Sequence, residues 1–75
     1  MYFIEIDEEK FAHLAVELSD QEKKVALLIA LGASNQKIAA DLNYSDGYVR
    51  NLTTRIYAKT GTADRNELKK LLLKP

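Results

Sequence analysis

The feature that most constrains the fold is the stretch NQKIAADLNYSDGYVRNL, in which two apolar stripes are separated by a short polar break. Before the break, Ala39 is a small residue on the apolar face of a helix. Asn43, four positions later, tolerates the left-handed backbone of a tight turn, and Ser45 can cap a following helix. Val49 and Leu52 are apolar at the tenth and thirteenth positions after Ala39. This spacing predicts two closely packed helices joined by about three residues, which is a helix-turn-helix.

The second helix of this pair, expected over about residues 46–59, has two sides of different composition. With roughly 100° of turn per residue, its apolar side gathers Val49, Leu52, Thr53 and Ile56. The opposite side gathers Gly47, Arg50, Asn51, Thr54 and Ala58. A merely solvated side would favour Glu and Lys, which are good helix formers. The near absence of acids therefore indicates that a partner meets this side.

The polar residues on the outward side suit a nucleic-acid partner. Arginine presents a fork that matches guanine O6 and N7, and asparagine can bind adenine N6 and N7 in the same two-point manner. Arg50, Asn51 and Thr54 can all donate hydrogen bonds to such a partner. Gly47 weakens helix propensity, but its missing side chain permits close approach to a phosphate.

The N-terminal part of the chain combines an acidic run with one amphipathic pattern. YFIEI alternates loosely and is compatible with a short strand or an extended arm. DEEKFAHLAVEL places Phe11, Leu14, Ala15 and Leu18 on one stripe, which predicts an amphipathic helix. We therefore expect residues 1–17 to form an acidic N-terminal arm and helix.

The remaining segments also have helix signals. Ser19 and Glu22 form a predicted capping box before the apolar run over 25–31, which Gly32 can close. Ser34 can cap the helix over 35–42, and Asp64 with Glu67 can start a short last helix. The predicted fold class is all-α, with a four-helix domain over residues 18–75.

Size and composition exclude several classes of protein. A chain of 75 residues forms one small domain with little room for an enclosed active site, and no nucleophile lies beside a base, so we expect no enzyme and no cofactor. Cysteine is absent and His13 is the one histidine, which argues against a metal site or disulfides. No apolar run is long enough for a membrane span, and the start lacks a secretory signal, so we expect a cytoplasmic protein.

The charge is balanced overall but unevenly distributed. Residues 1–22 contain seven acids and one lysine, a net charge of −6, and the remaining residues contain ten bases and four acids, a net charge of +6. This pattern suggests an acidic leader attached to a basic body, although solvated helix faces would explain it equally well.

The segment LSDQEKKVALLIALGASNQKIAADLNYSDGYVRNLTTRIYAKTGTADRNEL resembles the LuxR-type (GerE-like) DNA-binding domain of bacterial transcription regulators. The motifs LSDQE, ASNQKIA, SDGYVR, RIYAKTG and DRNEL carry the resemblance, in order and with the family's spacing. It implies a four-helix domain whose third helix enters the major groove of double-stranded DNA. By matching position, it implies base contacts by Arg50, Asn51 and Thr54.

The resemblance also implies a set of residues near the DNA phosphates: Ser34, Asn35, Lys37, Ser45, Gly47, Tyr48, Arg55 and Lys59. The chain departs from the family's usual residues at Tyr48, Leu52 and Thr53, and Thr60 replaces a common leucine. Leu52 can take over the packing role that Thr53 weakens. Tyr48 can reach a phosphate or pack against Tyr44.

The last helix, with its leucines close together, predicts self-association. We expect Leu68, Leu71 and Leu72 to form a weak homodimer, because one face of a short helix can meet the core and the others must face outward. A frayed terminus with exposed leucines is the alternative. The resemblance further implies RNA polymerase or an attached sensor or receiver domain as partners.

Two alternative functions fit the same helices. Region four of a sigma factor is also a helix-turn-helix that contacts promoter DNA, but the terminal DRNELKKLLL helix favours a regulator. A protein-interaction module with this fold would suit the acidic leader and the zero net charge. Steep salt dependence of binding would distinguish a DNA-binding protein from such a module.

Overall fold

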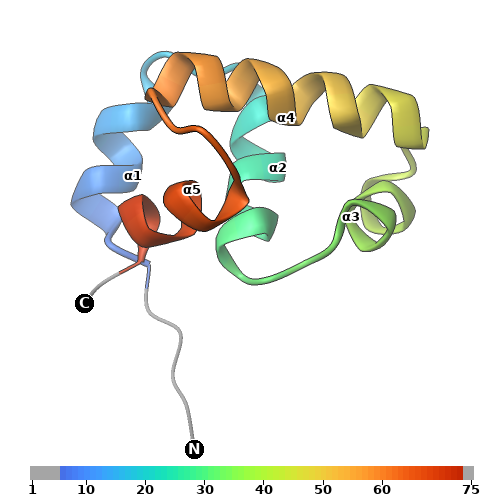
Figure 1. The fold of residues 1–75 in the computed structure, drawn as a ribbon, viewed down its shortest axis with the longest axis horizontal. Helices are drawn as coiled ribbons and strands as arrows, with labels where there is room; N and C mark the ends of the chain where they lie inside the picture. The colour runs from blue at the N-terminus through green and yellow to red at the C-terminus, as the bar shows by residue number, and fades with distance from the viewer. Residues whose placement is uncertain (1–5, 74–75) are drawn as a thin grey trace, which may run out of the picture.

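The chain folds into five α-helices within residues 6–73, the part that the computed structural model describes (Figure 1). They are α1 (Glu8–Ala15), α2 (Asp20–Ala30), α3 (Asn35–Leu42), α4 (Asp46–Thr60) and α5 (Arg65–Leu72). The described residues contain no strand, only an isolated antiparallel bridge between Ile6 and Leu73. The all-α prediction is confirmed, with one leader helix before the four-helix unit. The predicted strand or arm over YFIEI lies outside the described residues, apart from Ile6.

Helices α2, α3, α4 and α5 begin at the residues that their capping signals predict. Ser19 Oγ accepts a hydrogen bond from Glu22 N at 3.2 Å, and Glu22 Oε1 accepts one from Ser19 N at 2.8 Å, so the capping box of α2 is complete. Ser34 and Ser45 cap α3 and α4 in the same way. At α5 the box is shifted, because Asp64 accepts from Glu67 N while the Glu67 carboxylate accepts from the amide of the residue before Asp64.

Left-handed backbone conformations end α2, α3 and α4. Gly32 and Gly61 have φ angles of 93° and 71°, which glycine adopts without steric penalty. Asn43 has φ 58°, and among residues 6–73 it is the one non-glycine residue with a positive φ. Since α3 ends at Leu42 and α4 begins at Asp46, three residues join them, as the sequence predicts. The helix-turn-helix is therefore formed by α3 and α4.

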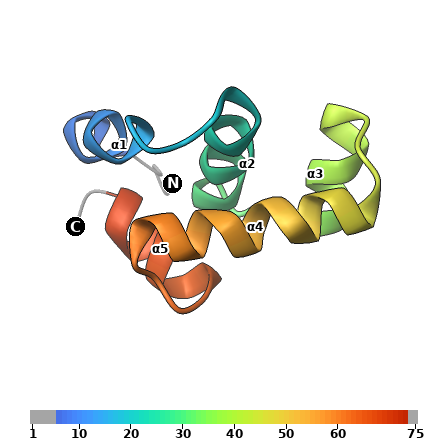
Figure 2. The same ribbon diagram turned by 90° about the horizontal axis from the view of Figure 1, so that it is seen from above.

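The core lies where α2 passes between the other helices (Figures 1 and 2). Val25, Ala26, Ile29 and Ala30 of α2 are fully buried against Ile56 of α4 and the leucines of α5. On the other side, Ile38 and Ala39 of α3 pack beneath the N-terminal half of α4. This packing fixes the orientation of α4 with respect to α3.

The leader helix α1 is shorter than its apolar stripe predicts. It ends at Ala15, and Leu18 enters the core from the following turn, with 7% of its surface exposed. Phe11 and Leu14 are half-buried against the core cluster. The start of α1 is tied to the end of α5, because Asp7 N donates to Leu72 O at 2.7 Å.

The prediction that Leu68 and Leu72 lie at a dimer interface is wrong. Their exposed fractions are 0% and 1%, so both side chains belong to the core of their own domain. The cause is that α5 contacts α1 as well as α2 and α4, so more than one face of this short helix is covered. Leu71 is the half-buried member of the predicted set. Within residues 6–73, no helix has the length and apolar character needed to cross a bilayer.

Candidate nucleic-acid interface

The two sides of α4 are oriented as the helical pattern predicts. Val49, Leu52, Thr53 and Ile56 are buried, with exposed fractions between 0% and 5%. Arg50, Asn51 and Thr54 are exposed on the opposite side, together with Gly47, Arg55 and Ala58. The structure thus brings the three predicted base-contacting residues onto one exposed surface of α4.

Two threonines of α4 complete their hydrogen bonds within the helix. Thr53 Oγ1 and Thr54 Oγ1 both donate to Arg50 O, at 2.8 and 3.1 Å. The buried Thr53 hydroxyl is therefore satisfied, which explains how a polar residue replaces an aliphatic one on the core side. The exposed Thr54 hydroxyl donates its proton to Arg50 O, so it can offer a partner an acceptor oxygen and a methyl group.

Nothing within the fold requires glycine at position 47. The residue lies in the first turn of α4 without a positive φ, and a Cβ atom built on it would have no heavy atom within 4 Å. Gly32 and Gly61 are different, because their positive φ angles disfavour other residues. The small size of Gly47 therefore leaves open space beside the backbone of α4 for a molecule outside the chain.

The first turns of α3 and α4 present hydrogen-bond donors. Ser34 Oγ and Ser45 Oγ accept from the amides of Lys37 and Tyr48, each at 3.1 Å. A hydroxyl that accepts one hydrogen bond keeps its proton free to donate. The first backbone amides of a helix also lack intrahelical acceptors and carry partial positive charge. Both helix starts can therefore bind an anion such as a phosphate.

The cations near this surface differ in how available they are to bind an anion. Arg50 and Arg55 are exposed and form no ion pair with any residue between 6 and 73. Lys37 Nζ lies 3.0 Å from Asp41 Oδ1 in an exposed pair on α3. Such surface pairs contribute little to stability, so Lys37 can exchange this partner for another anion at small cost.

Lys59 has an internal partner. Its Nζ donates to Glu22 Oε1 at 2.7 Å, and the Glu22 side chain is only 2% exposed. Burial raises the pKa of Glu22, but the hydrogen bonds from Lys59 and the Ser19 amide, together with the charge of Lys59, outweigh burial and lower the pKa below its ordinary value. The ammonium group of Lys59 thus neutralises a buried carboxylate, which makes it less available to a phosphate than the sequence predicts.

Tyr48 takes the packing role that the sequence leaves open. Its ring meets that of Tyr44 edge to face, with centroids 4.9 Å apart and planes at 87°. This is a favourable aromatic geometry. Tyr48 nevertheless remains 41% exposed, so its ring also contributes to the surface beside the start of α4.

Arg65 is a residue that the sequence does not single out by itself, although it lies in the DRNEL motif. Its Nη2 donates to Ala33 O at 2.8 Å and to Asn35 Oδ1 at 3.3 Å. The predicted phosphate contact Asn35 is thus held by a residue of α5. A cation in the first turn of a helix is electrostatically unfavourable, and this is the signal that could have drawn attention to Arg65.

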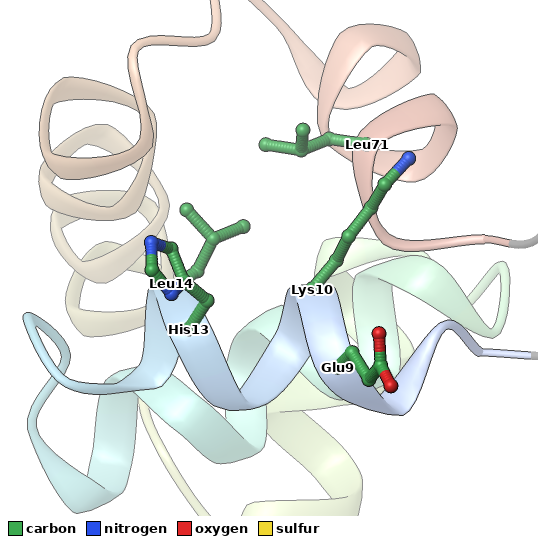
Figure 3. Close-up of a pocket in the computed structure, with 5 residues that line it drawn as sticks. All are labelled: Glu9, Lys10, His13, Leu14 and Leu71. Atoms are coloured by element: carbon green, nitrogen blue, oxygen red, sulfur yellow. The ribbon is translucent and has the colours of Figure 1, made fainter.

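A shallow groove of about 290 Å³ lies between α1 and α5 (Figure 3). It is on the part of the domain away from α3 (Figure 1). Leu14 of α1 and Leu71 of α5 provide its apolar lining, and Lys10 extends from α1 toward α5 (Figure 3). Glu9 and His13 complete the lining. Among residues 6–73, no three His, Cys, Asp or Glu side chains gather as metal ligands would.

Comparison with known proteins agrees with this geometry. The family described as "Bacterial regulatory proteins, luxR family" (GerE) matches residues 16–72. A protein of Cyanophora paradoxa named "Probable transcriptional regulator ycf29" is 36% identical over 64 residues, which cover 85% of this chain. The chain spans about 30% of the length of that relative. No solved structure gives a significant match.

Proposed function

The chain belongs to the LuxR family of bacterial regulatory proteins, and on that premise we propose that it binds double-stranded DNA sequence-specifically and regulates transcription. In this proposal α4 lies in the major groove as the recognition helix and α3 supports it. The observation that carries the proposal is the exposed surface of α4, where Arg50, Asn51 and Thr54 lie together while the opposite side is buried. The family match also favours a regulator over region four of a sigma factor.

We assign the base contacts to three side chains of α4. Arg50 suits guanine, because its guanidinium can donate to O6 and N7 together. Asn51 suits adenine, because its amide can accept from N6 and donate to N7. Thr54, whose hydroxyl donates to Arg50 O, can accept from an exocyclic amine or place its methyl group against that of thymine.

The phosphate contacts surround this surface. Ser34 and Ser45 can donate their hydroxyl protons, and the backbone beside Gly47 is accessible. Asn35, Lys37, Tyr48 and Arg55 supply further donors. Lys59 is left out, because it is bonded to Glu22. RNA polymerase, or a sensor or receiver domain, would have to bind elsewhere, since DNA would occupy the exposed side of α4.

We further propose that two copies associate weakly on DNA through the groove between α1 and α5. Leu71 is the member of the predicted set that remains accessible, and Leu14 extends the apolar lining beside it. Such a small interface would be weak in solution and strengthened when one duplex holds both copies.

A protein-interaction module is the second candidate, and one observation favours it. Two of the cations expected to meet phosphate, Lys37 and Lys59, pair with acids of the chain itself. Arg50 and Arg55 are then the cations of α4 that form no ion pair with any residue between 6 and 73.

The decisive experiment selects bound sequences from random duplexes at stated salt concentrations. A DNA-binding regulator enriches one sequence, and the logarithm of its binding constant falls linearly with the logarithm of salt concentration. A protein-interaction module enriches none and shows no such slope. The second result would reject DNA binding and favour the protein-interaction module.

A further inference from the structure

Arg65, the first residue of α5, reaches across the domain to the start of α3. Its Nη2 donates both to Ala33 O, at 2.8 Å, and to Asn35 Oδ1, at 3.3 Å. Asn35 is the first residue of α3 and lies 30 positions earlier in the chain. One nitrogen of Arg65 thus links α5 to the loop before α3 and to a side chain of α3.

The hydrogen bonds of Arg65 Nη2 must offset two unfavourable features of its position. Its Nε is buried and has no hydrogen-bond partner among residues 6–73. A buried donor without an acceptor destabilises the folded state, and a cation at the start of α5 opposes the helix dipole. The interactions of Nη2 therefore provide the reason for an arginine at this position.

Arg65 determines which end of the Asn35 amide faces outward. A guanidinium donates hydrogen bonds and cannot accept one, so only the oxygen of Asn35 can face it. A flipped amide would place its NH2 group against a cation. The Nδ2 atom therefore points away from Arg65, and no residue of the described range accepts a hydrogen bond from it.

We propose that Arg65 is a positioning residue for DNA binding, which holds Asn35 Oδ1 so that the Asn35 NH2 group is turned outward as a donor to a DNA phosphate. This inference rests on the proposed function. The site suits an anion, because the adjacent Ser34 hydroxyl keeps its proton and the first amides of α3 lack intrahelical acceptors. Without Arg65 the amide would lose the hydrogen bond that holds its oxygen inward, so its NH2 group would be presented to phosphate for only part of the time.

A double-mutant cycle tests the coupling between the two residues. The affinity of the full chain for its selected duplex is measured for Asn35→Ala, Arg65→Gln and the double variant. Asn35→Ala should weaken binding about tenfold or more, as expected for one lost hydrogen bond to a charged group. The double variant should bind no more weakly than Asn35→Ala, because Arg65 acts through Asn35. Additive losses would overturn the inference.

The salt dependence separates positioning from direct contact. Arg65→Gln should keep the slope of the wild type, because Asn35 is neutral and its contact displaces no counterion. A direct contact between Arg65 and phosphate would instead make the slope shallower by about 0.9. That result would overturn the positioning role.

Asn35→Asp tests the inference even if the Arg65→Gln variant does not fold. A carboxylate at this position pairs with Arg65 and lies at a helix start, so the urea midpoint should stay equal or rise. Affinity should fall on every duplex by more than in Asn35→Ala, because an anion replaces the donor. If Asn35→Asp bound DNA with wild-type affinity, the positioning role of Arg65 would be rejected and the proposed function would stand. If the wild-type protein bound no duplex, both the positioning role and the proposed function would be rejected.

Discussion

Lys59 donates to Glu22 across 2.7 Å and thereby joins the last turn of α4 to the first turn of α2. Glu22 Oε1 also accepts from Ser19 N, so one carboxylate oxygen both caps α2 and holds the end of the proposed recognition helix. Because Glu22 is 2% exposed, the ammonium group compensates a charge that water cannot reach. The orientation of α4 therefore depends partly on this pair.

Lys59→Met should destabilise the domain, because it leaves the buried Glu22 carboxylate without its cation. Lys59 is 40% exposed, so water can replace part of the lost interaction. We therefore expect the free energy of unfolding to fall by an amount in the lower half of the range of roughly 1–3 kcal/mol. Lys37→Met is the matched control, since its partner Asp41 is exposed and its pair should contribute less than about 1 kcal/mol. Urea unfolding measures both. Equal losses would show that burial of Glu22 has no energetic role.

The lowered pKa of Glu22 predicts loss of stability in acid. A carboxyl group whose pKa is lower in the folded state stabilises the fold above its unfolded pKa, and this contribution disappears as pH falls through the folded value. The free energy of unfolding should therefore decline below about pH 4.3, the ordinary value for glutamate. Glu22→Gln should flatten this decline. An unchanged pH profile in Glu22→Gln would assign the acid sensitivity to other groups.

Gly47→Ala should stabilise the fold and weaken DNA binding. The added methyl group meets no atom of the chain and the backbone is helical, so alanine should add up to about 1 kcal/mol. The same group would intrude on a phosphate near the start of α4. Gly61→Ala is the contrasting variant, because its φ of 71° should make it destabilising. A Gly47→Ala variant with wild-type affinity for DNA would remove Gly47 from the proposed interface.

Leu71→Glu should leave the fold intact and prevent pairing of two copies on DNA. Its neighbour Leu72 is 1% exposed, so Leu72→Glu should unfold the domain instead. Analytical ultracentrifugation with a palindromic duplex compares the wild type with Leu71→Glu, and circular dichroism reports folding of both variants. A strictly one-to-one wild-type complex would exclude the dimer.

The α3–α4 pair was predictable because each of its features is local. Residues three and four apart determine which side of α4 is buried, and Asn43 and Ser45 define the turn and the cap within a few residues. The buried side of α4 and the left-handed Asn43 agree with the sequence prediction. Local sequence patterns were therefore sufficient to predict the exposed surface of α4 that we propose to bind DNA.

The errors arise where distant segments meet. The predicted exposure of Leu68 and Leu72 assumed that one face of α5 packs on the core, whereas α1 covers a further face of α5. The pairing of Lys59 with Glu22 spans 37 positions, and helical periodicity contains no information on such a contact. Lys59 therefore looked like a free cation in the sequence, although it is bonded to a buried carboxylate.

We propose that Arg50 reads a base while Arg55, five positions further along α4, contacts the backbone of the DNA. The most direct measurement compares Arg50→Ala with Arg55→Ala on the selected duplex and its single-base variants at several salt concentrations. Arg50→Ala should lose about 1–3 kcal/mol of binding free energy and lose preference at one base position. Arg55→Ala should weaken all duplexes alike and make the salt slope shallower by about 0.9. Unchanged affinity and unchanged base preference in Arg50→Ala would contradict the assignment of α4 as the recognition helix.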